Sequence, residues 1–173
     1  MTRHVALTGF MAAGKSTIGK RLARKLGVPF VDLDDAIAAE HGPIPEIFER
    51  DGEAQFREYE RAALERALAD PAGIIALGGG AVTHDPTLSL VQSRTYSIFL
   101  RVAPEQALSR LRRSRRRRPL AGKEPSLRSI RDLYEARLPR YLLADRVLDA
   151  RSMTTAQIVE TLAAWIAEQP AQQ

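Results

Sequence analysis

The sequence of 173 residues contains no cysteine. Disulfides, thiolate nucleophiles and zinc sites built on cysteine are therefore excluded. The three histidines, His4, His41 and His84, are scattered along the chain and lack the spacing of a metal site. Any bound metal is therefore expected to be Mg²⁺ held by oxygen ligands.

Long apolar runs are also missing, because none approaches the ~20 residues that a transmembrane helix needs. Lys15 and Lys20 interrupt the N-terminal stretch, which therefore lacks the pattern of a secretory signal. We expect a cytoplasmic protein without a membrane partner. The length suits a single domain over residues 1–173 with a substantial core.

Positive charge is in excess, with a formal net charge of +5, but the excess lies in one segment. Residues 112–118 hold six arginines and no acid, while the rest of the chain has 20 basic against 21 acidic side chains. We expect a mobile, arginine-rich lid over about 112–125 that brings an arginine to a transferring phosphoryl group. A solvated loop is one alternative. An RNA-binding patch is another, which the lack of interleaved aromatic residues disfavours.

Residues 9–16 carry the strongest functional motif, because they satisfy the spacing G-x-x-x-x-G-K-[ST] of a phosphate-binding loop. Glycine allows the sharp turn and the close approach of backbone N–H groups to phosphate oxygens. Lys15 adds a charge that can reach the β- and γ-phosphates, and Ser16 supplies a hydroxyl for Mg²⁺. An apolar run at 4–8 precedes the motif and an amphipathic pattern at 15–26 follows it. The sequence therefore predicts a nucleoside triphosphate site between a strand and a helix.

Strand-like and helix-like segments alternate along the whole chain. The patterns predict strands at 4–8, 29–32, 73–77, 95–101 and 146–149, and helices at 15–26, 34–41, 44–51, 53–69, 85–92, 104–112, 126–143 and 154–168. This alternation predicts an α/β fold with a parallel sheet and helices on both faces. Ligands of such sheets bind beyond the carboxyl ends of the strands.

Three aspartates, Asp32, Asp34 and Asp35, follow the second predicted strand. If the strand geometry continues, Asp32 and Asp34 point the same way. One carboxylate would lie near the Mg²⁺ shell and another at the hydroxyl to be phosphorylated. We assign the chemistry to Asp34 and the Mg²⁺ shell to Asp32, and give Asp35 a helix cap or a solvent position.

Three further features are candidates for binding the substrate. Either Arg57 or Arg61, on the same predicted helix, can bind a carboxylate with two parallel hydrogen bonds, although a surface ion pair fits the spacing equally well. Either Arg137 or Arg140, near the end of a long predicted helix, could face the cleft. Residues 78–80 are three glycines at a strand end, and we interpret them as opening space for a ligand rather than as packing residues.

Taken together, these motifs resemble the shikimate kinase family. The resemblance rests on G-F-M-A-A-G-K-S-T at 9–17, D-L-D at 32–34, I-F-E-R-D-G-E-A-Q-F-R at 47–57, G-G-G at 78–80, R-P-L at 118–120 and R-x-x-x-Y at 137–141. It covers nearly the whole chain, from His4 to about Trp165. It implies a three-layer P-loop kinase fold like that of nucleoside monophosphate kinases, with strand order 2-3-1-4-5, and a monomer.

The resemblance also implies the reaction and the acceptor site. The activity would be ATP-dependent phosphorylation of the 3-hydroxyl of shikimate, in the route to chorismate and aromatic amino acids. Asp34 would contact the substrate hydroxyls and serve as base, and Arg57 and Arg137 would bind the shikimate carboxylate. Gly79 and Gly80 would line the ring, within a substrate-binding region whose helices span about 33–61.

For the nucleotide, the resemblance implies phosphate binding by Ala12, Ala13, Gly14, Lys15, Ser16 and Thr17, with Lys15 also catalytic. Arg118 of the lid would bridge to the ATP phosphates, and Asp32 would sit near Mg²⁺ through water, with Ser16 as a ligand. Arg112 is the candidate for stacking on adenine, with a register open by one or two residues. Two positions depart from the family pattern: Ala12 replaces a loop glycine, and the lid continues Pro-Leu-Ala-Gly instead of Pro-Leu-Leu.

Other functions remain possible from the sequence. A gluconate kinase or another small-metabolite kinase would use the same fold. A nucleoside monophosphate kinase is disfavoured, because its lid usually pairs arginines with aspartates and this segment has no acid before Glu124. From a different class, the chain could be an arginine-rich RNA-binding nucleotide switch, although we expect no nucleic-acid partner.

Overall fold

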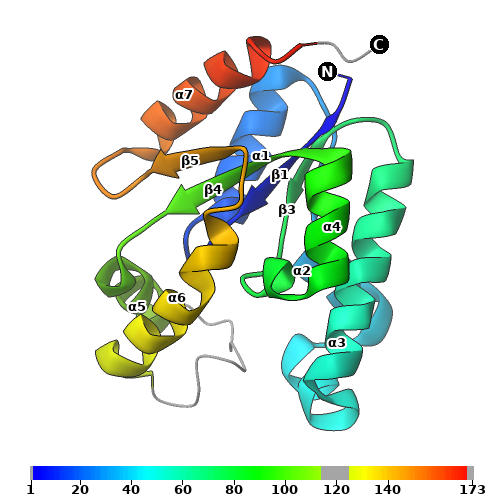
Figure 1. Ribbon diagram of the computed structural model, residues 1–173, viewed down its shortest axis with the longest axis vertical. Helices are drawn as coiled ribbons and strands as arrows, with labels where there is room; N and C mark the ends of the chain where they lie inside the picture. The colour runs from blue at the N-terminus through cyan, green and yellow to red at the C-terminus, as the bar shows by residue number, and fades with distance from the viewer. Residues whose placement is uncertain (1, 114–124, 171–173) are drawn as a thin grey trace.

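The computed structural model describes residues 2–113 and 125–170 (Figure 1). Its elements, in chain order, are β1 (His4–Thr8), α1 (Lys15–Leu26), β2 (Phe30–Asp32), α2 (Leu33–His41), α3 (Ile44–Ala69), β3 (Ile74–Ala76), the 3₁₀ turn η1 (Ala81–Thr83), α4 (Asp85–Arg94), β4 (Thr95–Arg101), α5 (Pro104–Arg113), α6 (Leu127–Tyr141), β5 (Arg146–Asp149) and α7 (Thr155–Ala167). Every predicted strand and helix is present. The short turn η1 was not predicted.

The long helix α3 corresponds to two predicted helices. Its backbone leaves the helical conformation at Gly52, where φ is 81° and ψ is 172°. A positive φ is readily adopted by glycine, which has no Cβ. The predicted break between 44–51 and 53–69 is therefore confirmed as a kink at Gly52.

The five strands form one parallel sheet in the order β2-β3-β1-β4-β5, as the family resemblance implied. Figure 1 shows α1 and α7 on one face of this sheet and α3 and α4 on the other. The central strand β1 is buried along its whole length, as is usual for a parallel strand covered by helices on both faces. The three-layer architecture is therefore confirmed.

Two aromatic contacts fix α6 to the edge where the strands end. Tyr134 meets the ring of Phe10 edge-on with centroids 5.5 Å apart, and Tyr141 stacks on Phe99 of β4 at 5.0 Å. Tyr134 and Tyr141 are seven residues apart, so they lie on the same face of the helix. Arg137, which lies between them in sequence, is therefore held toward the strand ends.

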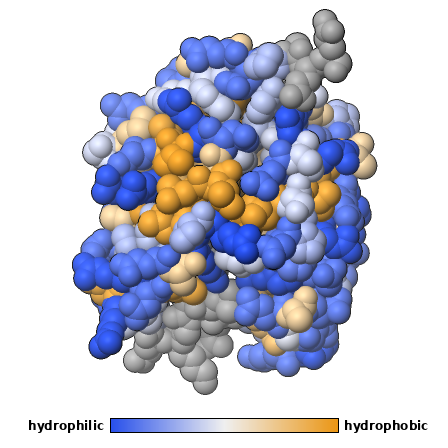
Figure 2. Space-filling model, viewed as in Figure 1, coloured by the Kyte–Doolittle hydropathy of each residue, from blue (hydrophilic) through white to orange (hydrophobic). Residues whose placement is uncertain are grey.

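Apolar side chains also remain at the surface. Figure 2 shows them gathered across the middle of one face. Among the described residues, the large hydrophobic side chains most exposed to solvent are Leu142, Leu143 and Val147, just after α6 and on the edge strand β5. Within the same ranges, no helix combines the length and the hydropathy needed to cross a bilayer.

His4 has a structural role at the other end of the sheet. Its Nδ1 accepts a hydrogen bond from the backbone N–H of Gly73 at 3.2 Å, so the proton lies on Nε2, which donates to the carbonyl of Asp70 at 3.2 Å. Burial lowers the pKa of His4 below its usual value of 6.5, and the Asp70 carbonyl opposes this shift. Through these two hydrogen bonds, the neutral ring of His4 connects the loop before β3 to the start of β1.

This arrangement predicts how stability depends on pH. Folding lowers the pKa of His4, so the neutral ring stabilises the folded protein. This contribution to the free energy of unfolding is present above the unfolded pKa of 6.5 and is lost as pH falls through the folded pKa. Between pH 7.5 and 5.5, we expect the wild type to lose more unfolding free energy than His4→Asn, which cannot titrate. Urea denaturation at both pH values measures this difference, and equal losses would contradict it.

Candidate active site

A pocket opens at the carboxyl edge of the sheet between α3 and α6, with about 410 Å³ of empty space, its open mouth included. Its wall combines two arginines, two carboxylates, the glycine run and several apolar side chains. All five residues predicted to bind the substrate line it: Asp34, Arg57, Gly79, Gly80 and Arg137. The remaining lining residues are Met11, Ile44, Phe48, Phe56, Glu60 and Gly78.

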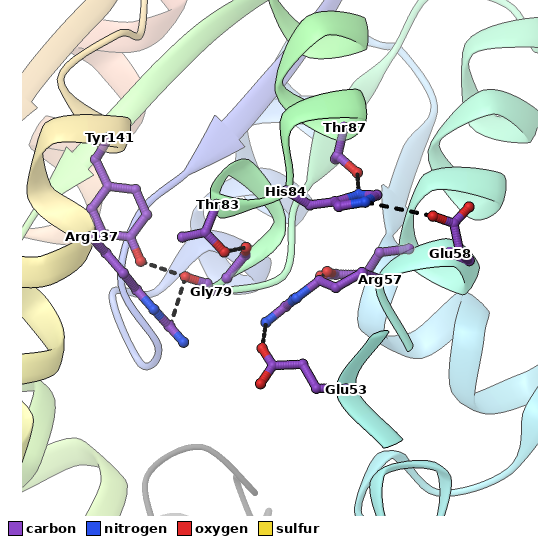
Figure 3. A network of polar contacts seen from close by, with 11 residues as sticks. Glu53, Arg57, Glu58, Gly79, Thr83, His84, Thr87, Arg137 and Tyr141 are labelled. Atoms are coloured by element: carbon purple, nitrogen blue, oxygen red, sulfur yellow. Dashed lines mark hydrogen bonds and ion pairs between the residues drawn. The ribbon is translucent and has the colours of Figure 1, made fainter. Parts of the chain in front are cut away.

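Arg57 lies in the wall of this pocket and is only 6% exposed. Its Nη1 donates to the carboxylate of Glu60, one turn later in α3, and its Nη2 donates to Glu53 at 2.8 Å (Figure 3). Burial acts to lower the pKa of Arg57, but the charges and hydrogen bonds of the two glutamates outweigh it, and the net shift is upward. The surface ion pair that the sequence left open is therefore wrong for Arg57, whose guanidinium is buried and faces the pocket, whereas Arg61 forms one with Glu58 and Glu65.

Glu60 was not assigned a role from the sequence, although it is fully buried beside Arg57. Its Oε1 has no hydrogen-bond partner among the residues that the structure describes. Burial raises the pKa of Glu60 to about 7, against the pull of Arg57 and with a contribution from the charge of Asp34. The spacing i, i+3 from Arg57 was the available signal, since residues three apart are neighbours on one helix face.

Two of the three glycines, Gly78 and Gly80, pack directly against these charged groups, while Gly79 lies against the backbone of Met11. A Cβ on Gly78 would lie 2.1 Å from Oε1 of Glu60, and a Cβ on Gly80 would lie 2.5 Å from Nη2 of Arg57. The interpretation that the run has no packing role is therefore wrong. Side chains are excluded here because the buried ion pair occupies their space.

Arg137 reaches the same glycine segment from α6 on the opposite side of the pocket (Figure 3). Its Nη1 donates to the carbonyl of Gly79 at 3.1 Å, and the hydroxyl of Tyr141 donates to the same oxygen. Burial raises the pKa of Tyr141 to about 12, so the hydroxyl keeps its proton and remains a donor. Arg140 instead pairs with Asp85 at 2.7 Å with its side chain 40% exposed. Of these two arginines, Arg137 faces the pocket.

The aspartates after β2 are arranged differently from the prediction. The strand ends at Asp32, whose carboxylate caps α2 by accepting from the backbone N–H groups of Asp34 at 3.1 Å and Asp35 at 3.4 Å. We expected Asp35 to cap the helix or to face solvent. The cap of α2 is Asp32 and not Asp35. Strand alternation also does not extend to Asp34, which instead lies in the first turn of α2 and lines the pocket.

The phosphate-binding loop connects β1 to α1 through three residues with positive φ: Gly9 at 142°, Ala12 at 58° and Gly14 at 96°. Ala12 is the departure from the family pattern, and its left-handed conformation explains why glycine suits this position, since a Cβ there costs about 1 kcal/mol. Gly14 is the N-cap of α1. Among the described residues, no side chain caps the first turn of this helix, and no acidic residue lies in that turn. Backbone N–H groups at such a helix start bind phosphate well.

Two cationic side chains lie against this loop. Nζ of the buried Lys15 donates to the carbonyls of Gly9 at 2.8 Å and Phe10 at 3.0 Å. From α5, Nη1 of Arg110 donates to the carbonyl of Ala12 at 3.1 Å. Arg112, the predicted adenine contact, is exposed near the end of α5. Arg118 and residues 114–124 of the predicted lid lie outside the described residues.

The residues predicted for Mg²⁺ lie at the carboxyl edge of the sheet. Ser16 is in the first turn of α1 and Asp32 ends β2. Within residues 2–113 and 125–170, no group of three or more His, Asp or Glu side chains could hold a metal. A hydroxyl and a carboxylate still fit Mg²⁺, because this ion keeps several waters and takes oxygens from the nucleotide phosphates.

Comparison with known proteins identifies the family. A family model described as shikimate kinase matches residues 11–167. The chain belongs to the shikimate kinase family. This family member is 39% identical to a shikimate kinase of Moorella thermoacetica, over 96% of this chain and 98% of the relative. It is 40% identical to a shikimate kinase of Stenotrophomonas maltophilia, over 92% of each chain.

Solved structures agree with this assignment. The shikimate kinase of Acinetobacter baumannii, solved in complex with shikimate, has a TM-score of 0.90 and 30% identity, covering 99% of this chain and 97% of that one. A gluconokinase from Sinorhizobium meliloti has a TM-score of 0.67 at 19% identity, covering 96% of this chain and 92% of that one. The second likeness shows the fold alone.

The buried Glu60 gives a prediction for this family member. Because folding raises its pKa from 4.5 to about 7, the folded state binds more protons in this range, and stability falls as pH rises through it. Between pH 4.5 and 7, we expect the wild type to lose on the order of 1–3 kcal/mol relative to Glu60→Gln, which cannot ionise. Urea denaturation at several pH values in this range measures the free energy of unfolding of both proteins. The slopes of these free energies against pH are then compared.

Glu65→Gln is the matched control, since Glu65 lies on the same helix and pairs with Arg61 at 46% exposure. Its slope should match that of the wild type. If the free energy of unfolding of Glu60→Gln depends on pH as steeply as that of the wild type, the pKa of Glu60 is not raised by folding and the prediction is wrong.

Proposed function

We propose that this protein transfers the γ-phosphoryl group of ATP to the 3-hydroxyl of shikimate, giving shikimate 3-phosphate. The observation that carries the proposal is the pocket next to the phosphate-binding loop, which Arg57 and Arg137 face from different helices while Asp34 and Glu60 supply carboxylates. Two guanidinium groups suit a carboxylate ligand, and the carboxylates accept from hydroxyl groups. An acid with several hydroxyls, such as shikimate, matches this charge pattern.

On the acceptor side, Arg57 and Arg137 bind the carboxylate of shikimate, and the backbone of Gly79 and Gly80 lines its ring. Asp34 orients the 3-hydroxyl. It accepts the proton of this hydroxyl late, as the bond to phosphorus forms. Glu60 pairs with Arg57 at the same wall and so holds that guanidinium in place.

On the donor side, the backbone of Ala12, Ala13, Gly14, Ser16 and Thr17 binds the ATP phosphates. Lys15 exchanges the carbonyls of the loop for β- and γ-phosphate oxygens. Ser16 and Asp32 would hold Mg²⁺ with its waters, and the ion would neutralise charge on the phosphates.

Arginines complete this donor site in the proposal. Arg118 contacts the transferring phosphoryl group and Arg112 stacks on adenine. For a loose transition state, the protein's task is alignment and neutralisation of charge on the phosphate oxygens.

The wider assignment follows from the same proposal. A single domain over residues 1–173 carries the reaction, with the acceptor bound by the segment at about 33–61, which contains Asp34 and Arg57. The enzyme acts as a cytoplasmic monomer in the route to chorismate, without nucleic-acid or membrane partners. Light scattering after gel filtration tests the monomer, and the exposed Leu142 and Leu143 are the first place to examine if a dimer is found.

Gluconate kinase activity is the second candidate, because gluconate is also a polyhydroxylated acid. An assay coupled to ADP release, run with shikimate, gluconate and nucleoside monophosphates, separates these activities. Faster turnover of any other acceptor would overturn the proposal. A gel shift with RNA at physiological salt tests the nucleotide switch, since weak phosphate contacts are lost there.

Replacing Asp34 tests the chemical step. Asp34→Asn removes the charge that orients and deprotonates the hydroxyl, so kcat should fall by about 10²- to 10⁴-fold while Mg-ATP binding by calorimetry is unchanged. Asp35→Asn is the matched control in the same helical turn. Near-normal turnover of Asp34→Asn would show that the role is misassigned.

Replacing Arg57 tests its role in binding the carboxylate of shikimate. Arg57→Lys keeps the charge but loses the planar fork, so the KM for shikimate should rise by about 10- to 100-fold with little change in the KM for ATP. Arg66→Lys, on the same helix but paired at the surface with Glu40, is the control. An unchanged KM for shikimate would count against the assignment.

A further inference from the structure

The two arginines that face the pocket belong to different helices. Arg57 is on α3 and Arg137 is on α6, so the distance between their guanidinium groups depends on how these helices are held relative to each other. A carboxylate bridged by two such groups is sensitive to this distance, because displacements of about 1 Å weaken a preorganised site. The contacts that connect α3 to α6 around the pocket therefore bear on how the acid is held.

His84 makes the connection to α3. It is the N-cap of α4, and its Nε2 lies 3.5 Å from Oε1 of Glu58, the residue that follows Arg57 (Figure 3). Its Nδ1 lies 3.1 Å from the hydroxyl of Thr87. When that hydroxyl donates to Nδ1, the ring proton is on Nε2, and in the protonated ring Nε2 also carries a proton. In both states an N–H faces the carboxylate of Glu58.

Asp85 makes the connection to α6. Its Oδ1 lies 2.7 Å from Nη1 of Arg140, which is three residues after Arg137 and therefore on the adjacent turn of the same helix. Two consecutive residues at the start of α4 thus hold a neighbour of each pocket arginine. His84 pairs beside Arg57, and Asp85 pairs beside Arg137.

The segment just before these residues is also fixed to the pocket wall. The hydroxyl of Thr83 donates to the carbonyl of Gly80 at 2.6 Å, and the N–H of His84 donates to the carbonyl of Ala81 at 3.3 Å. Neither His84 nor Asp85 lines the pocket. Any influence on substrate binding must therefore act through the position of the helices.

We propose that His84 and Asp85 are positioning residues that brace α3 against α6 and so set the separation of Arg57 and Arg137. The proposal rests on the proposed function in taking shikimate as the acid that the two arginines hold. Surface ion pairs add little to global stability, because solvent screens them. Loss of the brace should therefore weaken acid binding without unfolding the protein.

Steady-state kinetics of the full chain test this brace, with shikimate and ATP varied separately. The test variants are His84→Leu, Asp85→Asn and the double variant. His84→Gln is the conservative variant, because its amide can present an N–H to Glu58. A variant with both Asp85→Lys and Arg140→Glu reverses the ion pair, and Asp85→Lys alone is measured for comparison.

We expect the double variant to raise the KM for shikimate by about three- to tenfold, with kcat and the KM for ATP within twofold of the wild type. His84→Gln should stay close to the wild type, and the reversed pair should restore most of what Asp85→Lys loses. Glu105→Gln, which breaks the comparably exposed pair between Glu105 and Arg131 on α5 and α6, should change nothing.

A folded double variant with a wild-type KM for shikimate would overturn the brace. So would equal changes in the KM values for ATP and shikimate, which would indicate a general structural role. If the double variant does not fold, failure of the reversed pair to improve on Asp85→Lys overturns it instead. Absence of wild-type turnover with shikimate would refute the proposed function. The brace would then be judged by the ratio of variant to wild-type KM for the acid that the protein does phosphorylate.

Discussion

The contact between the buried guanidinium of Arg57 and the buried carboxylate of Glu60 is the constraint on which the acceptor end of the molecule depends. Taking two charges out of water is costly, and a close pair recovers that cost only when its geometry is good. The pair also requires a neighbouring chain without side chains, which Gly78 and Gly80 provide. Helix α3 and the loop after β3 therefore specify each other, although they are distant in sequence.

The fold could be predicted largely from the sequence because its signals are local. Strands and helices follow from apolar periodicity, and the phosphate-binding loop follows from a motif whose spacing is fixed by backbone geometry. The order of the strands is not a local property, and it came from the resemblance to a family. The kink at Gly52 was also predictable, since glycine adopts positive φ where other residues do not.

The pocket was predictable in its residues but not in its contacts. Periodicity alone left Arg137 and Arg140 open, and the choice of Arg137 came from the resemblance to the family. The aromatic contacts of α6 give the physical reason, because they turn the face with Arg137 inward. The cap at Asp32 depended on a strand that ends one residue before the helix begins, a boundary that periodicity does not resolve. Glu60 was missed because its carboxylate is buried against Gly78, a contact that its own helix does not reveal.

The carbonyl of Gly79, held by both Arg137 and Tyr141, makes one side of the pocket out of main chain. A main-chain oxygen is present whatever amino acid is encoded, and a side chain on Gly78 or Gly80 would collide with Glu60 or Arg57. An inhibitor that packs against this part of the wall would therefore leave the gene few single changes by which to escape it. A compound that relied on the apolar contacts of Ile44 or Phe48 would face a surface that mutation can remodel freely.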